Sequence, residues 1–557
     1  LTNRKAAIDI IENLRTKVDS NELRTSYFAT VQDIYKLHID ILMQLHKQNP
    51  SKGYDAQALA TSEKSRARGL LELLTEANAD IRKDVNPELV AQEKQLQQLI
   101  NSKEKLRLEI VSDKNKSNDL ISKAAAQRFK KEVQNHIYEL NQLKAKIKTT
   151  SPKYAKLKYP EPLNLNQIQQ QLDKDTVLLQ YSLGEKRSYL WKVTPNSLDS
   201  YELPKSEEIE ETANKLRNLL QDPSTQNRSP EETSKAATEL SKLILTPVAN
   251  QLGKKRLVIV GDDALQYIPF AALTDLNAQS QEKQTDVNYQ PLLINHEIVH
   301  LPSASTIDIL RKETAQRPIA PKTLAVLADP VFCKDYQPAT GKPCNDKNID
   351  IDVEAYRSSD FDKIDSLPHT RKEAEEILKL VSPANSLQAF DFDANYNWAT
   401  QKQLSNYRYL HFATHGFVDT ENPQLSGIVL SLFDKQGNPQ KEGFLRLHEL
   451  FNLNFPAELV VLSACQTGLG KEVKGEGLVG LTRGLMYAGA ERVVLSLWKV
   501  KDDSTSLLMR QFYQEMLQQG KSPASALREA QIKMWQTQEW RNPYYWAAFT
   551  IQGEWKM

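Results

Sequence analysis

Apolar residues recur at two different periods along the chain, and the period changes near residue 158. In the first 150 residues they return every three or four positions, which predicts amphipathic helices. Beyond that point short apolar β runs alternate with amphipathic helices, as in TVLLQYSLGEKRSYLWKV and YRYLHFATHG. Such alternation predicts a mostly parallel sheet flanked by helices on both faces. The expected fold is therefore an α/β domain preceded by an all-α region.

The helical region divides into two parts. Residues 1–80 predict three helices, carried by the stripe Ile8, Ile11, Leu14 and Val18, by YFATVQDIYKLHIDILMQLHKQ, and by ALATSEKSRARGLLELL. Residues 81–152 predict two long, highly charged helices, lined by Leu89, Leu96, Leu99, Leu106 and Ile110 and by Phe129, Val133, Ile137, Leu140 and Ile147. Narrow apolar stripes joined by a polar link predict an antiparallel coiled-coil hairpin. Such a hairpin serves either as a spacer or as an arm that binds a partner.

The α/β region divides near residue 320. Residues 153–320 predict a β-hairpin turning near Gly184, two helices and short strands; this half contains no Cys, and neither His296 nor His300 precedes a Gly. Residues 321–557 predict a second series that starts at KTLAVLADP and includes a helix in GLVGLTRGLMYAG. Active sites of such sheets lie beyond the carboxyl ends of the strands. We expect the chemistry in the second half.

Two side chains capable of nucleophilic catalysis follow strands of that half. His415 ends the strand predicted in YRYLHFATHG, and Cys465, fifty residues later, ends the strand predicted in LVVLSACQTGLG. A His-to-Cys spacing of about 50 residues is found in caspase-type cysteine proteases. A thiolate attacks a carbonyl, and a base accepts its proton and then protonates the leaving amine. The backbone amides of Gly416 and Cys465 are candidates for the oxyanion hole. Taken alone, Cys465 also fits a small buried hydrophobe.

A second histidine, His411, lies inside the same β run between Leu410 and Phe412. We interpret it as a residue of the core, or as one that supports the base from behind, rather than as the base itself. The spacing His411-x3-His415 also resembles a pair of zinc ligands. The HExxH motif, however, requires a helix and a Glu between the histidines, and here the intervening residues are FAT in a β run. No metal and no cofactor are expected.

Composition narrows the class of protein. With 40% apolar and 26% charged residues among 557, the chain fits a soluble globular protein of three or four folding units. Lys plus Arg number 72 and Asp plus Glu 71, so the net charge of +1 gives no attraction to nucleic acid or membrane. No apolar run approaches the ~20 residues of a membrane helix.

Cysteine use bears on the compartment. Only Cys333, Cys344 and Cys465 are present, which indicates no disulfide framework and favours the reducing cytoplasm. Cys333 and Cys344 are either free loop thiols or a regulatory disulfide. The first residue is not Met, so a preceding segment with a signal stays an open alternative.

Four segments in order carry a resemblance to a known family. HFATHG, LSACQTG, GEGLVGLTRGLMYAGAERVVLSLW and PYYWAAF together resemble the CHAT peptidases, caspase- and separase-like (clan CD) proteases attached to tetratricopeptide arrays. LMQLHKQNPSKGYDAQAL and SRARGLLELL resemble the helical region of cyanobacterial members. The resemblance implies a caspase–haemoglobinase fold and peptide-bond cleavage by His415 and Cys465. It also implies that residues 1–80 end a tetratricopeptide-like array, 153–320 form a pseudo-protease half and 321–557 the catalytic half.

The segment after LSLW suggests a specificity. Separases have a similar Trp followed by an acidic cluster near the pocket for the residue before the scissile bond, and here the chain continues KVKDDSTSLLM. Asp502 first and Asp503 second would bind a substrate Arg or Lys through charge-assisted hydrogen bonds. The alternative is that they cap the following helix.

Other acidic and basic positions also match the family pattern. Glu476 either orders the loop after Cys465 or favours a helix start. Arg371 and Glu373 are interpreted as structural or loop-anchoring.

The resulting prediction is a regulated cysteine endopeptidase that acts on a specific protein substrate. Its helical region would bind the substrate or a protein activator, and the loop 331–366 would block the site until then. One alternative is a catalytically silent interaction scaffold of the same family. Another is a different acyl chemistry on the same dyad, such as that of an amidase or transferase. The sequence sets no oligomeric state.

Overall fold

The structure is a computed structural model of the chain. It describes residues 2–16, 27, 29–78, 86–112, 120–150, 161–222, 224, 231–277, 289–333, 367–419, 422–440, 442–463, 470–473, 477–499 and 501–556. Within these ranges no helix has the length and hydropathy needed to cross a membrane.

The helices precede and interleave with the strands. Before the first strand lie α1 (Thr2–Thr16), α3 (Gln32–Gln48), α4 (Tyr54–Lys64), α5 (Arg68–Asn78), α6 (Pro87–Ser112), α7 (Leu120–Thr150) and α8 (Leu165–Gln171). Between the strands lie α9 (Ser206–Gln221), α10 (Glu231–Leu245), α11 (Ala304–Thr314), α12 (Pro368–Leu378), α13 (Tyr396–Ala399), α14 (Leu447–Leu450), α15 (Leu481–Tyr487), α16 (Asp502–Leu517), α17 (Pro523–Gln536) and α18 (Pro543–Trp546).

One large sheet of eleven strands spans both halves of the α/β region in the order β3-β2-β1-β4-β5-β16-β15-β12-β8-β6-β7. Its strands are β1 (Thr176–Ser182), β2 (Ser188–Val193), β3 (Leu198–Leu203), β4 (Arg256–Val260), β5 (Ile298–His300), β6 (Lys322–Pro330), β7 (Ser386–Asp391), β8 (Tyr407–Ala413), β12 (Leu459–Ser463), β15 (Arg492–Ser496) and β16 (Phe549–Gly553). Two small sheets contain β9 (Gly416–Phe417), β10 (Gly427–Val429) and β11 (Phe444–Arg446), and β13 (Gly470–Val473) and β14 (Gly477–Gly480).

The parallel strands of the two halves run in opposite directions. Strands β6, β7, β8, β12 and β15 are mutually parallel, as are β1, β4 and β5. The connecting strand β16 is parallel to β5 but antiparallel to β15. The carboxyl ends of the two sets therefore lie on opposite edges of the sheet, and a site at one edge cannot include residues that follow strands of the other set.

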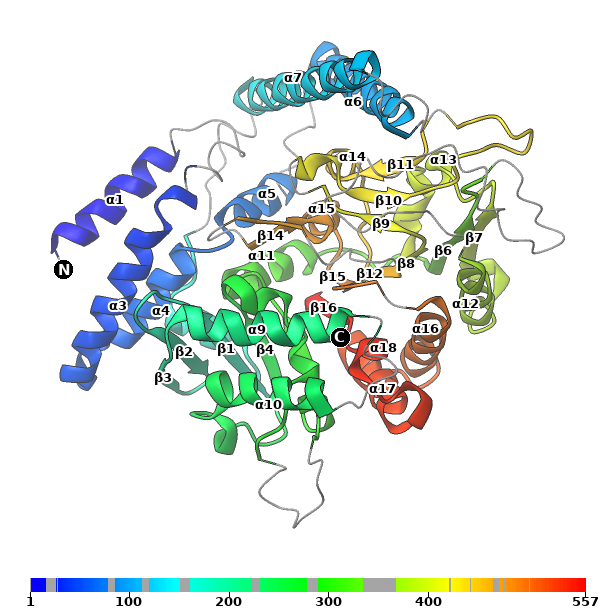
Figure 1. Ribbon diagram of the computed structural model, residues 1–557. Coiled ribbons are helices and arrows are strands. Elements are labelled where there is room, and N and C mark those ends of the chain that lie inside the picture. Colours follow the sequence, from blue (N-terminus) through cyan, green and yellow to red (C-terminus); the bar gives the residue numbers. More distant parts are fainter. Residues whose placement is uncertain are drawn as a thin grey trace.

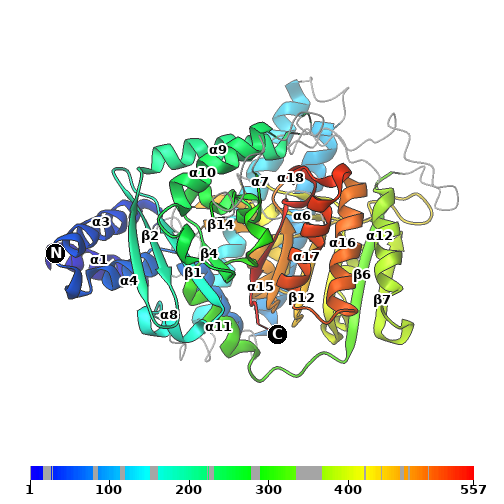
Figure 2. The same cartoon turned by 90° about the horizontal axis from the view of Figure 1, so that it is seen from below.

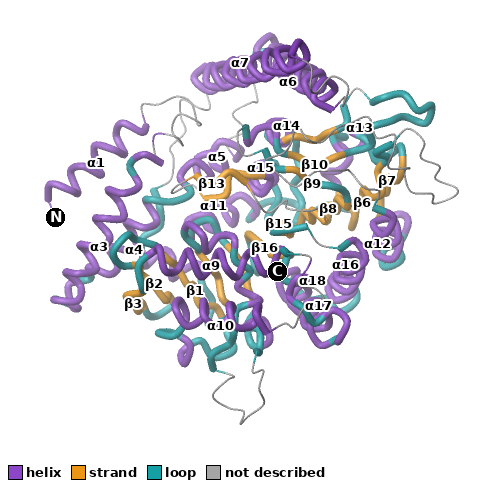
Figure 3. The backbone as a smooth tube through the Cα atoms, in the orientation of Figure 1, coloured by secondary structure: helices purple, strands orange, loops and turns teal. Residues whose placement is uncertain are grey.

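Helices cover both faces of the large sheet (Figures 1 and 2). The helices α9, α10, α12, α16, α17 and α18 lie on one side, while α5, α11 and α15 lie on the other. The tube view in Figure 3 shows the small sheet β9–β11 and α14 on that second side, with the pair α6 and α7 outermost. The expected fold class, a mostly parallel sheet flanked by helices and preceded by an all-α region, is confirmed.

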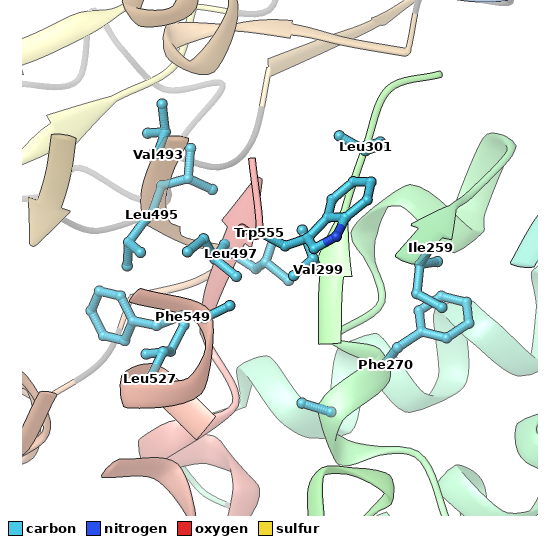
Figure 4. Close-up of a cluster of buried hydrophobic side chains, with 14 of the residues drawn as sticks. Ile259, Phe270, Val299, Leu301, Val493, Leu495, Leu497, Leu527, Phe549 and Trp555 are labelled. Carbon is cyan, nitrogen blue, oxygen red and sulfur yellow. The ribbon is translucent and has the colours of Figure 1, made fainter. Parts of the chain in front are cut away.

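The apolar core continues across the junction of the halves. Figure 4 shows Val299 and Leu301 of the first half close to Trp555, with Val493, Leu495 and Phe549 on the second-half side. All of these side chains are buried and belong to the same cluster. Burial of continuous apolar surface is the main favourable term in folding. The two halves therefore share one core rather than touching through a polar interface.

The third predicted helix, ALATSEKSRARGLLELL, is two helices in the structure. The helix α4 ends at Lys64, α5 begins at Arg68, and between them Ala67 adopts a positive φ of 48°. The break directs the Arg66 guanidinium towards the sheet, where it donates to the carbonyls of Gly261 (3.0 Å) and Tyr181 (2.6 Å). A tertiary contact has overridden helix propensity here.

The stripe predicted for the first helix holds only in part. Ile8 and Ile11 are buried against Tyr35, whereas Leu14 is exposed and Val18 lies outside the described residues.

The two long helices form the predicted hairpin, but the residues buried between them differ in part from the predicted stripes. Leu89 packs with Leu143 and Ile147, and Leu96 lies along the same seam, which makes the pair antiparallel. The prediction for Leu106 was wrong, because it is exposed. The predicted stripes omitted Ile100 of α6 and Leu143 of α7, which are both buried. For Ile100, the reason for that burial is a contact with the α/β region, described below.

The helix predicted in GLVGLTRGLMYAG is shorter than expected. Residues 477–480 form β14, and α15 begins only at Leu481. Glycine is costly in a helix interior because it loses the most backbone freedom. Gly477 and Gly480 therefore favour the extended pairing with β13.

Candidate functional site

His415 follows the carboxyl end of β8, next to the end of β12. The two strands are parallel, and Ala413 of β8 is paired with Ser463 of β12. His415 is two residues beyond Ala413. Adjacent strands lie about 4.8 Å apart, so the chain leaves both strands at neighbouring points of one edge.

The His415 backbone is fixed by the small sheet. Its carbonyl accepts a hydrogen bond from the Val429 N–H at 2.8 Å, and the Thr414 hydroxyl donates to the Val429 carbonyl. The imidazole is buried at 4% exposure and lies 5.1 Å from the Phe332 ring, centroid to centroid. Phe332 belongs to a small apolar cluster with Phe417, Val429 and Leu432, separate from the main core. The surroundings of His415 thus depend on the β9–β10 pairing.

Gly416 begins β9 and lies opposite Ile428 of β10 in an antiparallel pair. In such a ladder hydrogen-bonded and non-hydrogen-bonded residue pairs alternate. Because the preceding pair, His415 and Val429, is hydrogen-bonded, the Gly416 N–H is directed away from β10. Since β9 is an edge strand of its sheet, this amide faces no strand of that sheet.

His411 lies away from His415, inside the core. Its Nε2 is 2.8 Å from Glu373 Oε1 of α12 and its Nδ1 is 3.1 Å from the Tyr513 hydroxyl of α16. His411, Glu373 and Tyr513 are all fully buried. These bonds tie β8 to the two helices beneath it, which agrees with a structural place for His411 and Glu373.

Asp502 lies at the start of α16, on the same edge as His415. Its carboxylate accepts a hydrogen bond from the His369 N–H, in the first turn of α12, at 2.8 Å. Burial raises the pKa of Asp502 to about 7, with further upward contributions from Glu373, Asp503 and Asp329, against the lowering effect of the His369 N–H. A carboxyl whose pKa is raised by burial at the edge that carries the candidate base is a recognised mark of functional sites.

Asp503 differs from its neighbour. It is exposed, and its carboxylate accepts only from the adjacent Ser504 N–H at 2.7 Å among the contacts described. The N-cap of α16 is Lys501, so neither aspartate is the N-cap of that helix. Asp502 instead satisfies an amide at the start of α12.

Arg371 anchors the ends of two strands. Its guanidinium donates to Asp329 at 2.9 Å and forms an ion pair with Asp391, and it lies 4.7 Å from the centroid of the Phe390 ring. The two aspartates, at the ends of β6 and β7, both adopt a positive φ. Arg371 therefore holds α12 over the edge that carries the site.

Several predicted residues fall outside the described residues. They are Cys465, its backbone amide, Glu476, Cys344 and almost all of the loop 331–366. Cys333, at the start of that loop, is buried and disulfide-bonded. Within the described ranges no group of three or more His, Cys, Asp or Glu side chains is arranged to bind a metal ion.

Sequence reasoning missed Phe332, Tyr513 and Leu425, all of which contact the candidate site or the elements that carry it. Phe332 and Tyr513 have no local signal, because their partners lie far away in the chain. Leu425 has a weak local signal, since it is the single large apolar residue in the polar stretch DTENPQLSG.

The fold is an α/β sheet covered by helices, with His415 just beyond the carboxyl end of the parallel strand β8. A family model described as the CHAT domain matches residues 234–554. The chain belongs to the CHAT-domain family, which confirms the resemblance at the level of that domain.

Two curated relatives match a short part of the chain. Tetratricopeptide repeat protein 28 of Mus musculus is 36% identical over 115 residues, and its Homo sapiens counterpart is 32% identical over 115 residues. Each alignment covers 21% of this chain and 5% of the relative, so the chain spans about a twentieth of their length. Both relatives are mammalian, so they give no support to the expected cyanobacterial kinship.

Solved structures give low scores. The separase–securin complex of Saccharomyces cerevisiae aligns with TM-score 0.41 and 9% identity, covering 98% of this chain and 48% of that one. The Arg-specific cysteine proteinase gingipain R aligns with TM-score 0.35 and 11% identity, covering 63% and 75%.

Proposed function

We propose that the chain is a cysteine endopeptidase with a Cys465–His415 dyad. His415 accepts the Cys465 thiol proton, and the thiolate adds to the substrate carbonyl. His415 then protonates the amine as the C–N bond breaks, which leaves a thioester. Water attacks the thioester, releases the carboxylic acid and regenerates the thiol.

One observation carries the proposal. Ala413 and Ser463 are paired on adjacent parallel strands, and His415 and Cys465 each stand two residues beyond them in the sequence. Because both residues follow a paired position by the same number of residues, we expect them to lie near each other at this edge of the sheet. The burial of His415 against Phe332 supports the proposal further, because it limits the orientations of the base.

The oxyanion hole is assigned to the backbone amides of Gly416 and Cys465. The direction of the Gly416 N–H away from β10 supports this assignment, since an amide used in the β ladder cannot bind a substrate oxygen. Glu476 is assigned to ordering the loop after Cys465.

The specificity pocket is assigned to Asp502, with Asp503 second, for a substrate Arg or Lys. The position of Asp502 on the His415 edge and its raised pKa support the first choice. A bound guanidinium would lower that pKa and complete the ionisation. Because Asp503 is exposed, we assign it to a contact at the rim of this pocket.

The helical residues 1–80 and the hairpin 81–152 are assigned to binding a protein substrate or activator, and the proposed setting is the cytoplasm. Residues 153–320 are proposed to act as a non-catalytic half. Their parallel strands β1, β4 and β5 end on the edge opposite to His415, which supports that role.

The test is covalent labelling with an acyloxymethyl ketone probe that carries Arg at the first position. Native chain, Cys465→Ala and His415→Ala are compared by intact mass, with peptide mapping of the adduct. We expect an adduct on Cys465 in the native chain alone, because labelling requires both an activated thiol and its base.

A panel of probes with Lys, Leu and Asp at that position then tests specificity. Equal labelling across the panel contradicts the role of Asp502 while leaving the dyad intact. Silence of the native chain with every probe, with and without cell extract, supports the alternative, a catalytically silent scaffold of the same family.

A further inference from the structure

The α6–α7 hairpin packs on the segment that follows His415. Leu425, in the short 3-10 helix η13 (Pro423–Leu425), is buried with Ile100 of α6 and with Val133 and Leu140 of α7. This cluster is separate from the main core of the α/β region. The buried apolar partners of Leu425 in this cluster therefore all come from the hairpin.

One short strand separates Leu425 from the candidate base. The 3-10 helix runs directly into β10, whose Val429 N–H donates to the His415 carbonyl and whose Ile428 lies opposite Gly416. A displacement of Leu425 moves the start of β10. Because β10 pairs with both His415 and Gly416, it moves the base and the amide of the oxyanion hole together.

Polar contacts fix the hairpin to the other side of the same small sheet. The Asn101 side-chain amide donates to the carboxylates of Glu442 and Glu449 at 3.1 Å each. Glu449 also accepts from the Tyr396 hydroxyl at 2.8 Å and from the Arg446 N–H at 2.9 Å, next to β11. Buried carboxylates are stable only when their oxygens are bonded.

Two contacts with cationic side chains extend this interface along both helices. The Lys105 ammonium of α6 donates to the Gln440 carbonyl at 3.2 Å, and the Lys144 ammonium of α7 lies 5.4 Å from the centroid of the Phe451 ring. Figure 1 shows the pair α6 and α7 over α14 and β11, above the large sheet. The hairpin therefore contacts the segments that precede and follow β10 in the chain.

We infer that the α6–α7 hairpin positions His415 and Gly416 through Leu425. This inference rests on the proposed peptidase function. It identifies Ile100 and Leu425 as positioning residues, which touch no substrate and act through β10.

The test compares Ile100→Ala and Leu425→Ala in the full chain with Leu143→Ala. Leu143 lies in the other seam of the same hairpin, with Leu89 and Ile147, so its variant weakens the hairpin without removing the contact with Leu425. Leu425→Met keeps an apolar side chain of similar volume and serves as the conservative variant.

The first readout is hydrogen exchange of the peptides that cover residues 414–429. We expect faster exchange in Ile100→Ala and Leu425→Ala, and native exchange in Leu143→Ala and Leu425→Met. Ile100→Ala alone decides the point if Leu425→Ala fails to fold. Unchanged exchange in both alanine variants, or equal acceleration in Leu143→Ala, overturns the inference.

The second readout is the rate of Cys465 labelling at increasing probe concentration. A loss of positioning lowers the limiting rate by about tenfold or more while the half-saturating concentration stays unchanged. The limiting rate of the double variant, Ile100→Ala with Leu425→Ala, should be no lower than that of either single variant, because each substitution removes the same contact. If the native chain does not label, the proposed peptidase fails, and the exchange result still decides whether the hairpin holds this segment.

Discussion

At the scale of single residues, Asp502 and Asp503 show how burial changes the properties of a carboxyl group. The two are adjacent and identical, yet successive helical residues point about 100° apart. One meets the first turn of α12 and is partly buried, whereas the other faces solvent. The pKa of Asp502 rises to about 7 for that reason.

This raised pKa predicts a pH dependence of stability. Between about pH 4 and 7 the folded chain holds a proton on Asp502 that the unfolded chain has lost, so the free energy of unfolding falls as the pH rises through that window. Asp502→Asn keeps an acceptor for the His369 N–H and carries no charge. Its melting temperature should equal the native value near pH 4 and exceed it at pH 8.

Asp503→Asn is the matched control. It removes only the upward contribution of Asp503 to the Asp502 pKa, so its melting temperature at pH 8 should exceed the native value by less than that of Asp502→Asn does. A constant offset between native and Asp502→Asn across the range would contradict the prediction. The same titration should appear in function. The ratio of the labelling rate with an Arg probe to that with a norleucine probe should rise as the pH passes through about 7, because ionised Asp502 attracts the guanidinium. Taking the ratio cancels the titration of the base, which affects both probes.

At the scale of elements, α15 owes its packing to a glycine. A Cβ on Gly484 would lie 2.6 Å from Leu447 Cδ1 and 3.1 Å from Leu450 Cδ1 of α14. At this position two leucine methyl groups of α14 occupy the space that a side chain on α15 would fill. The element also contacts α5, so the N-terminal helices, α15 and α14 form a continuous layer.

Gly484→Ala should lower the free energy of unfolding by about 1–3 kcal/mol, measured by denaturant titration. In an ordinary helix interior the same change stabilises by about 1 kcal/mol. Leu447→Val in the variant background removes the nearest clashing methyl group and should restore part of the loss. Stabilisation by Gly484→Ala alone would show that α14 moves aside at no cost.

At the scale of the whole molecule, the N-terminal helices are built into the first half of the sheet. The fully buried Glu63 of α4 accepts from the backbone N–H groups of Ala304 and Ser305, at the start of α11, and from the Ser305 hydroxyl. Arg66 reaches the carbonyls of Tyr181 and Gly261 at the carboxyl ends of β1 and β4. The edge equivalent to the His415 edge is thus covered by helices in the first half.

Glu63→Ala should destabilise the protein by about 2–4 kcal/mol, because it leaves buried donors of α11 without acceptors. Glu239→Ala, which removes an exposed ion pair with Lys215, should cost less than about 1 kcal/mol. Calorimetry should show that the N-terminal helices and the first half melt in one transition. Separate melting of the helices would contradict the shared core.

Much of the fold followed from local pattern, because a strand or helix shows its own apolar period. Strand β8, strand β12 and the seam of α7 were predicted in this way. The break at Ala67 and the strand over residues 477–480 were not, since each depends on contacts with distant segments. The burial of Ile100 was also missed, because its partner Leu425 is more than three hundred residues away.

The sequence by itself determined the fold class, the family and the two strands that lead to His415 and Cys465, because these rest on short motifs and local periodicity. Only the tertiary structure decided that the strands of the halves run in opposite directions, that His411 is bonded to Glu373 and Tyr513, and that the hairpin buries Leu425. Those contacts join residues far apart in the chain. Their free energy depends on burial and pairing in three dimensions, which no local pattern encodes.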